Sequence, residues 1–285
     1  MQDYEKYMND FPVIPSVASK IMAIAEDNID ISFKELERII SIDPMLTTKI
    51  LKIANSALYA RQSEIKNLQM AITLLGFKKI KSLVILLTAS KFSRELKNRE
   101  ILAVFWRHSL ATAFIAKYIM IRKKWRKDEE TAFTAGLLHD IGQVALFQRY
   151  PEKYKVFLSD QSELGSLEQR EQMEQSLFNT NHRILGGYIL KKWNFPPVYV
   201  DTAEEHGIIN VKSVYKNNIY AVTLADLITE RTGFGQGCAI DDSLIMTISE
   251  YLDLDNDDIM FLMNDIMTAL ENDPLFQECQ LLFEF

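Results

Sequence analysis

The sequence predicts an all-α fold, and three observations support this prediction. Helix start and stop signals recur along most of the chain, no segment shows the sustained apolar–polar alternation of a half-buried strand, and no internal repeat is visible. Hydrophobic residues make up 48% and charged residues 25% of the 285 positions, which is ordinary for a globular protein with a substantial core. We therefore expect a body built from packed helices.

The first helices follow proline-marked and polar start signals. Pro12 and Pro15 mark an extended entry, after which an apolar periodic run begins at Ser16. Ser32 and Glu35 have the spacing of a capping box and precede a second apolar run. The sequence therefore predicts helix starts at residues 16 and 32.

The next signals are sharper. Asp43 is followed by Pro44, which combines an N-cap aspartate with proline at the first helical position. A further helix is expected over 69–75 and ends at Gly76, and another over 78–92 is amphipathic at its start and apolar later.

The central helices carry most of the apolar character. Residues 102–121 are apolar on nearly every face, which predicts a central buried helix. The helix expected over 129–138 continues into a His-Asp pair and stops near Gly142. The one over 182–193 is preceded by three polar residues and followed by two prolines at 196–197.

The last third shows acidic and glycine signals. A helix over 198–206 ends at Gly207, and a helix over 218–230 is followed by a glycine-rich loop. Two helices that begin near Asp241 and Asp255 close the chain, because acidic residues favour helix N-termini.

Two polar or glycine-rich stretches suggest internal boundaries. They are Ser93 to Arg99 and Gly233 to Gly237, and neither has the composition of a free linker. We predict an N-terminal helical part over 1–98, a helical core over 99–232 and a C-terminal helical extension over 233–285, packed into one body.

Charge and cysteine content exclude several classes of protein. The net charge of −7 argues against binding to nucleic acid, and the basic run 122–127 is explained by a helix C-terminus. Cys238 and Cys279 lie far apart, which excludes a disulfide framework and a Cys-rich zinc site. Neither a signal peptide nor an apolar stretch of membrane-spanning length occurs, so we expect a cytoplasmic protein without membrane contacts.

Histidine is scarce and clustered. All four histidines lie between positions 108 and 206, and one of them is followed directly by aspartate. Imidazole nitrogens and carboxylates are ligands for divalent metals. The residues of these types that we single out are His108, His139, Asp140, His182, His206 and Asp226. From chemistry alone, a metal site and a polar core without metal are about equally favoured.

The segment 136–142 resembles the His-Asp motif of the HD superfamily of metal-dependent phosphohydrolases. In that superfamily a first His, a His-Asp pair and a distant Asp follow in this order, and His108, His139-Asp140 and Asp226 match it. The resemblance implies that these four residues hold a divalent metal, with Fe, Mn, Mg, Zn and Ni as candidates. By resemblance to two-metal members of the superfamily, His182 and His206 are candidates to extend the site to a second metal.

More specifically, residues 8–230 resemble the HDOD domain of bacterial signalling proteins. The matching segments are 11–15, 43–46, 54–59, 71–76, 105–109 and 193–196. The resemblance implies an HD-like multi-helix bundle with an N-terminal helical subdomain. It also implies a regulatory module of signal transduction that works through protein partners and has no hydrolytic activity, so we assign no catalytic residue.

The alternative is a metal-dependent phosphohydrolase acting on a nucleotide or phosphate ester, and a small phosphorylated ligand suits both hypotheses. Gln143 stands where active relatives often carry Lys, a natural phosphate partner. His206 is followed by Gly207 where a double His is expected, and no HD-GYP signature follows, so cyclic-di-GMP phosphodiesterase activity is not expected. The lack of a basic residue beside the motif favours the regulatory module.

Overall fold

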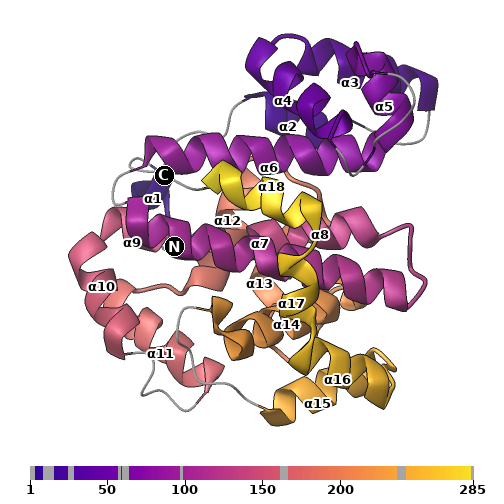
Figure 1. The fold of residues 1–285 in the computed structure, drawn as a ribbon. Coiled ribbons are helices and arrows are strands. Elements are labelled where there is room, and N and C mark those ends of the chain that lie inside the picture. The colour runs from indigo at the N-terminus through magenta and orange to yellow at the C-terminus, as the bar shows by residue number, and fades with distance from the viewer. Residues whose placement is uncertain are drawn as a thin grey trace.

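The computed structural model describes residues 4–8, 16–24, 29–56, 59, 64–96, 99–160, 166–235 and 242–283. Within these ranges the regular elements are helices and no strand occurs, so the all-α prediction is confirmed (Figure 1). The prolines of the segment 11–15, the cysteine at 238 and the helix start expected at Asp241 lie outside the described residues.

The N-terminal helices form a small group on one side of a long helix, α6 (Figure 1). Their core consists of residues such as Ile21, Leu36, Ile50 and Ile72, each at most 1% exposed. The elements are α2 (Ser16–Ala23), α3 (Ile29–Ile40), α4 (Pro44–Ala54), α5 (Leu68–Leu75) and α6 (Phe77–Glu95), whereas the short α1 (Glu5–Met8) packs against α9 of the larger core. Because α6 contributes residues to this core and to the larger one below it, it joins the two.

The larger core surrounds α7, which packs against α6, α8, α14 and α18. Residues on most faces of α7 are buried, which agrees with the expected central helix. The helices of this part are α7 (Arg99–Arg122), α8 (Glu129–Leu138), α9 (Ile141–Arg149), α10 (Pro151–Asp160), α11 (Leu167–Phe178), α12 (His182–Lys192), α13 (Pro197–Glu205) and α14 (Lys216–Thr229), followed by a π-helical turn, η3 (Glu230–Phe234).

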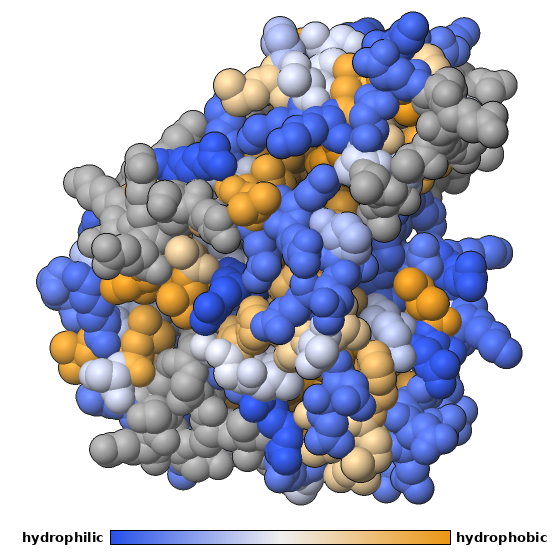
Figure 2. Space-filling view, viewed as in Figure 1, coloured by the Kyte–Doolittle hydropathy of each residue, from blue (hydrophilic) through white to orange (hydrophobic). Residues whose placement is uncertain are grey.

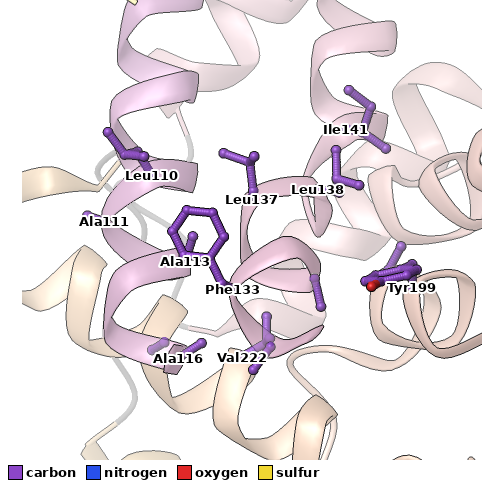
Figure 3. Packing of buried hydrophobic residues seen from close by; sticks show 14 of the residues in the cluster. Leu110, Ala111, Ala113, Ala116, Phe133, Leu137, Leu138, Ile141, Tyr199 and Val222 are labelled. Atoms are coloured by element: carbon purple, nitrogen blue, oxygen red, sulfur yellow. The ribbon is translucent and has the colours of Figure 1, made fainter. Parts of the chain in front are cut away.

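Small residues bring α7 and α8 into backbone contact (Figure 3). A Cβ atom on Gly136 would lie only 2.9 Å from the Cα of Ala113, so glycine is required for this approach. Phe133 and Leu137 on α8 are buried in the same core. The close contact holds the C-terminal end of α8, where the His-Asp pair begins, beside α7.

The C-terminal helices return to the two long central ones. They are α15 (Asp242–Tyr251), α16 (Asn256–Asn264), α17 (Ile266–Glu271) and α18 (Pro274–Phe283). α18 packs on α6 and α7, and the Phe283 ring stacks on Trp106 with 5.3 Å between centroids. This helix therefore covers the junction between α6 and α7 (Figure 1).

Several local signals operate as expected. The Asp43 side chain accepts hydrogen bonds from the amides of Met45 and Leu46, with Pro44 at the start of α4. Asp255 caps α16 by accepting from the Asp258 amide. Gly207, after α13, has φ +79°, the left-handed conformation expected of a residue that ends a helix.

Other boundary predictions are wrong. Ser32 lies inside α3, which begins at Ile29, and an N-cap residue cannot have helical backbone angles. The helix over 129–138 has the expected bounds, but helical structure does not stop near Gly142, because α9 begins at Ile141 directly after the His-Asp turn and two more helices, α10 and α11, follow. Residues 242–283 form four helices in place of the two expected for the C-terminal region, since short helices without strong caps give weak sequence signals.

The face in Figure 2 is mainly hydrophilic, with separate apolar areas between polar ones. Across the described residues, no helix combines the length and the apolar character that crossing a bilayer requires.

Candidate metal centre

The six residues singled out from the sequence converge in one place, although they come from five parts of the fold. His108 lies on α7, His139 and Asp140 form the turn between α8 and α9, His182 begins α12, His206 follows α13, and Asp226 lies on α14. The four histidines and Asp140 are at most 5% exposed. The side chain of Asp226 is 13% exposed. Such burial of unpaired polar groups is costly unless they bind one another or an ion.

The first half of the centre joins His108 and His139 to two carboxylates. Asp226 Oδ1 lies 3.0 Å from His108 Nε2 and 3.6 Å from His139 Nε2. Asp140 Oδ2 lies 3.3 Å from His139 Nε2 and 3.6 Å from His108 Nε2. These are the four residues of the sequence motif, and each of the two carboxylates lies within 3.6 Å of both imidazoles.

The second half uses the other oxygen of Asp140. Asp140 Oδ1 lies 3.6 Å from His206 Nε2 and 3.8 Å from His182 Nε2. Two groups of ligand atoms, each within 4.8 Å of one another, therefore share this carboxylate: His108, His139 and Asp140, and Asp140, His182 and His206. A carboxylate between two sets of imidazoles is suited to bridge two cations.

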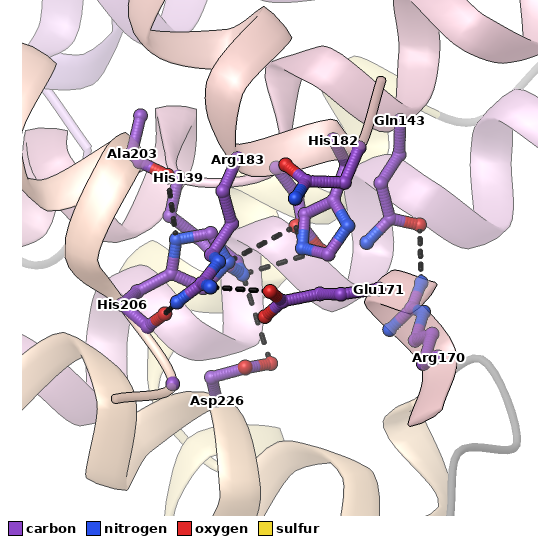
Figure 4. A network of polar contacts seen from close by, with 12 residues as sticks. His139, Gln143, Arg170, Glu171, His182, Arg183, Ala203, His206 and Asp226 are labelled. Atoms are coloured by element: carbon purple, nitrogen blue, oxygen red, sulfur yellow. Dashed lines mark hydrogen bonds and ion pairs between the residues drawn. The ribbon is translucent and has the colours of Figure 1, made fainter. Parts of the chain in front are cut away.

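The Nδ1 atoms of three histidines face acceptors outside the centre. His139 Nδ1 donates to the Gly136 carbonyl at 2.7 Å. His206 Nδ1 donates to the Ala203 carbonyl at 3.0 Å (Figure 4). His182 Nδ1 donates to Glu174 Oε2 at 2.6 Å. A carbonyl oxygen can only accept, so Nδ1 carries the proton and Nε2 of the neutral ring offers a lone pair to the centre.

His108 also directs Nε2 toward the centre, but its Nδ1 makes no hydrogen bond among the described residues. Its Nδ1 lies 3.7 Å from Glu230 Oε1, which is longer than a hydrogen bond. Glu230 stands four residues after Asp226, so the two carboxylates lie one helical turn apart and flank the same imidazole. Glu230 was not singled out from the sequence, although its i, i+4 spacing from Asp226 was a usable signal.

Buried atoms without partners test whether a cation fits. Within the described part of the chain, Nε2 of His108, Nε2 of His139 and Oδ1 of Asp140 make no hydrogen bond although they are shielded from solvent. These are lone-pair atoms of nitrogen and oxygen, the donor set of a borderline or hard divalent metal. The residues present therefore fit such a metal at both halves of the centre.

The electrostatics of the metal-free centre are those of coupled acids and bases. Burial would raise the pKa of Asp140, but His139 and the other imidazoles outweigh it and hold this pKa well below its usual value. Burial also opposes protonation of His139, yet Asp140 and Asp226 raise its pKa well above the usual value. Burial dominates at His206 and lowers its pKa to about 4, so that ring is neutral near pH 7.

Glu174 on α11 is a second residue that the sequence did not single out. It is fully buried, and its Oε2 accepts from both the backbone amide of His182 at 2.8 Å and the ring Nδ1. Its Oε1 lies 3.4 Å from the Tyr154 hydroxyl, which donates to it. No local pattern distinguishes this glutamate from the other acidic residues of α11.

Gln143, at the position where a lysine was sought, belongs to the same buried network. Its Oε1 accepts from Arg170 Nη2 at 2.8 Å and from the Tyr154 hydroxyl at 3.1 Å. Arg170 and Arg183 line a small pocket together with four of the proposed metal ligands, which are Asp140, His182, His206 and Asp226. Basic groups therefore lie at the centre, although none follows the His-Asp motif in the sequence.

Comparisons with known proteins agree with this architecture. Residues 11–209 match the family model described as the HDOD domain. A curated but uncharacterized protein of Treponema pallidum (strain Nichols) is 22% identical over 217 residues, which are 75% of this chain and 42% of that protein. The chain thus spans less than half the length of the curated relative that it matches.

Solved structures show the same fold. An HDOD domain protein of unknown function from Geobacter sulfurreducens has a TM-score of 0.78 at 24% identity, with 99% of this chain and 97% of that chain covered. A protein of Shewanella amazonensis SB2B whose name suggests a phosphohydrolase has a TM-score of 0.73 at 20% identity, with 99% of this chain and 98% of that chain covered. A protein from Marinobacter aquaeolei VT8 whose name suggests signal transduction has a TM-score of 0.73 at 15% identity. The match covers 99% of this chain and 62% of that chain.

Proposed function

Because the chain belongs to the HDOD domain family, we propose that it is a regulatory module of bacterial signal transduction that holds a divalent metal and does not hydrolyse a ligand. The module acts in the cytoplasm through contacts with protein partners. His108, His139, Asp140 and Asp226 hold the metal, and His182 and His206 extend the site to a second one. The metal is Fe, Mn, Mg, Zn or Ni.

One observation carries the metal-binding part of the proposal. Four imidazoles present Nε2 toward a single buried carboxylate, Asp140, and three of these ligand atoms make no hydrogen bond among the described residues. Buried polar atoms without a hydrogen bond cost about 1–3 kcal/mol each, and three of them lie in this centre. A cation satisfies all of them at once.

The absence of hydrolysis is supported by the chemistry at position 143. Gln143 is neutral and its Oε1 is already bonded to Arg170 and Tyr154, so it cannot supply the charge that a lysine would offer to a phosphate.

The alternative function is a metal-dependent phosphohydrolase that acts on a nucleotide or phosphate ester. It is favoured by Arg170 and Arg183, which line the pocket beside the proposed metal ligands. A bound divalent metal would supply this chemistry by lowering the pKa of a coordinated water. The residues of the chain would then orient the ester and exclude bulk solvent.

Metal content of protein purified without added metal tests the proposal. We expect stoichiometric metal in the wild type and a loss of most of it in His139→Ala, with unchanged helical circular dichroism. His139→Gln keeps more of the side-chain volume and serves as a second variant in case the alanine variant unfolds. Ser249→Ala changes a buried polar residue of α15, outside the centre, and should retain the metal.

The absence of metal from the wild type after purification and after incubation with each candidate ion would contradict the proposal. A screen of phosphate esters and cyclic nucleotides with Mn²⁺ separates the two functions. Turnover that disappears in His139→Ala would establish the phosphohydrolase in place of the regulatory module.

A further inference from the structure

The pocket beside the proposed metal ligands contains one ion pair that the metal does not need. Arg183, the second residue of α12, and Glu171 on α11 meet there in a salt bridge. Figure 4 shows this pair beside His206 and facing Asp226. The Arg183 side chain is 12% exposed and that of Glu171 19% exposed, so both are largely shielded yet border the pocket.

The backbone of His206, a proposed metal ligand, fixes the orientation of the Arg183 guanidinium. Its Nη1 donates to the His206 carbonyl at 2.9 Å, and its Nη2 donates to Glu171 Oε2. The Nε atom is buried and makes no hydrogen bond within the described part of the chain. Nε and Nη2 form the edge of a guanidinium that binds carboxylates or phosphates through two parallel hydrogen bonds. Glu171 uses only half of this edge.

The charges of the pocket favour an anion once the metal is bound. Three carboxylates line it, those of Asp140, Glu171 and Asp226, against two guanidinium groups. One divalent cation would turn this small excess of negative charge into an excess of positive charge. Glu171 is the carboxylate in this set that is not a proposed metal ligand, so it is the one that an incoming anion can replace without loss of metal.

We infer that Arg183 is a binding site for the phosphoryl group of a phosphate monoester, and that Glu171 occupies this site as an internal competitor in the ligand-free protein. A phosphoryl group offers three oxygens, enough for both donors of the Arg183 edge and for the metal. Arg170 borders the same pocket from α11. The inference rests on the proposed metal site, because the metal supplies the other contact to the anion.

The exchange also links the ligand to the fold. The salt bridge between Arg183 and Glu171 joins α11 to α12, and the ligand that replaces Glu171 releases this contact. A regulatory module without turnover would in this way convert the binding of a phosphorylated ligand into a change in how α11 is held.

Calorimetric titration with inorganic phosphate, and separately with a nucleoside 5′-monophosphate, tests the inference on the metal-loaded full chain. We expect Glu171→Gln to bind inorganic phosphate about tenfold more tightly than the wild type, because the competing charge is gone. Arg183→Gln should bind phosphate at least about tenfold more weakly than the wild type. Arg183→Lys should have an intermediate affinity, because lysine keeps the charge but lacks the paired donors of the guanidinium. Tighter binding of the nucleoside monophosphate than of phosphate would assign the ester as the ligand.

Two variants control for charge. Glu168 on α11 and Lys191 on α12 are exposed, and neither residue lines the pocket. The Glu168→Gln and Lys191→Gln proteins should therefore bind phosphate as the wild type does. All variants should keep the wild-type metal content. Equal phosphate affinity of Glu171→Gln and the wild type, or full affinity in Arg183→Gln, would overturn the inference and identify the ion pair as a helix clamp only.

Metal content, measured on the same samples, keeps the two proposals separate. If the wild type holds no metal, the proposed function fails and the present inference fails with it, because the metal supplies one of the contacts to the anion. If the metal is present and the order is absent, only the present inference fails.

Discussion

At the level of single residues, the centre depends on which nitrogen of each imidazole faces inward. The Gly136 and Ala203 carbonyls accept from Nδ1 of His139 and His206, which leaves Nε2 of each ring for a cation. Both acceptors are backbone atoms three residues before the histidine. The orientation is thus set by helical geometry, and no particular acceptor side chain is needed.

Glu174 sets the orientation of His182, and we predict that Glu174→Gln weakens metal binding about 10- to 100-fold. The amide keeps the size of the side chain but loses the charge that stabilises two N–H donors of His182. Competition with a chromophoric chelator measures the affinity. Glu168→Gln on the same helix is the control, and an unchanged affinity in Glu174→Gln would show that His182 is oriented without this carboxylate.

At the level of elements, the contact between α9 and α12 determines how the His-Asp turn meets the other histidines. A Cβ atom on Gly142 would lie 1.9 Å from the His182 carbonyl oxygen and 2.8 Å from the Gly186 amide nitrogen. Gly142 follows Asp140 by two residues, and His182 begins α12. The position of Asp140 relative to His182 is therefore set by a backbone contact that only glycine permits.

We predict that Gly142→Ala destabilises the protein by about 3 kcal/mol and lowers metal affinity at least about tenfold, because overpacking pushes α9 and α12 apart. Gly186→Ala is the matched control, since its Cβ would meet its nearest neighbour at an ordinary 3.4 Å. Chemical denaturation and chelator competition measure the two effects. Equal stability of the two variants would contradict this account of the contact.

Two cores characterise the whole molecule. Residues from α2 to α6 form the smaller one, and residues centred on α7, α8 and α14 form the larger one, where the six predicted ligands lie. The proposed metal ligands come from α7, the turn between α8 and α9, the start of α12, the end of α13, and α14. A cation would cross-link all of these elements within the larger core. The division at residues 98 and 232 stays a prediction.

We therefore predict that metal stabilises the folded state by about 2.7 kcal/mol at a free concentration one hundred times the dissociation constant. The midpoint of thermal unfolding should rise when metal is added and fall with a chelator. In His139→Ala the addition of metal should leave the midpoint unchanged. A wild-type midpoint that does not respond to metal would contradict the cross-link.

The pH dependence of metal affinity follows from the protonation of the metal-free centre. Burial opposes charge on His108 and His139, but the nearby carboxylates raise the pKa of both rings. These protons must leave before Nε2 binds a cation, so metal affinity should increase as the pH rises through these pKa values and decrease on acidification. Calorimetric titrations in buffers of different ionisation enthalpy would measure the released protons, and a pH-independent affinity would contradict this prediction.

The sequence by itself determined the all-α class, most helices of the first and central parts, and the identity and order of the candidate ligands. Helical periodicity and caps are local signals, and His108, His139, Asp140 and Asp226 form a recognisable motif. The local signals of α9, α10 and α11 are weak, so the sequence does not predict these three helices.

Only the tertiary structure decided the arrangement of the centre: that Asp140 faces two pairs of imidazoles, that Glu174 orients His182, and that Arg183 and Glu171 share the pocket. These contacts join residues far apart in the chain. Their partners are selected by how helices pack, through positions such as Gly136 and Gly142, and no periodicity in the sequence records that packing.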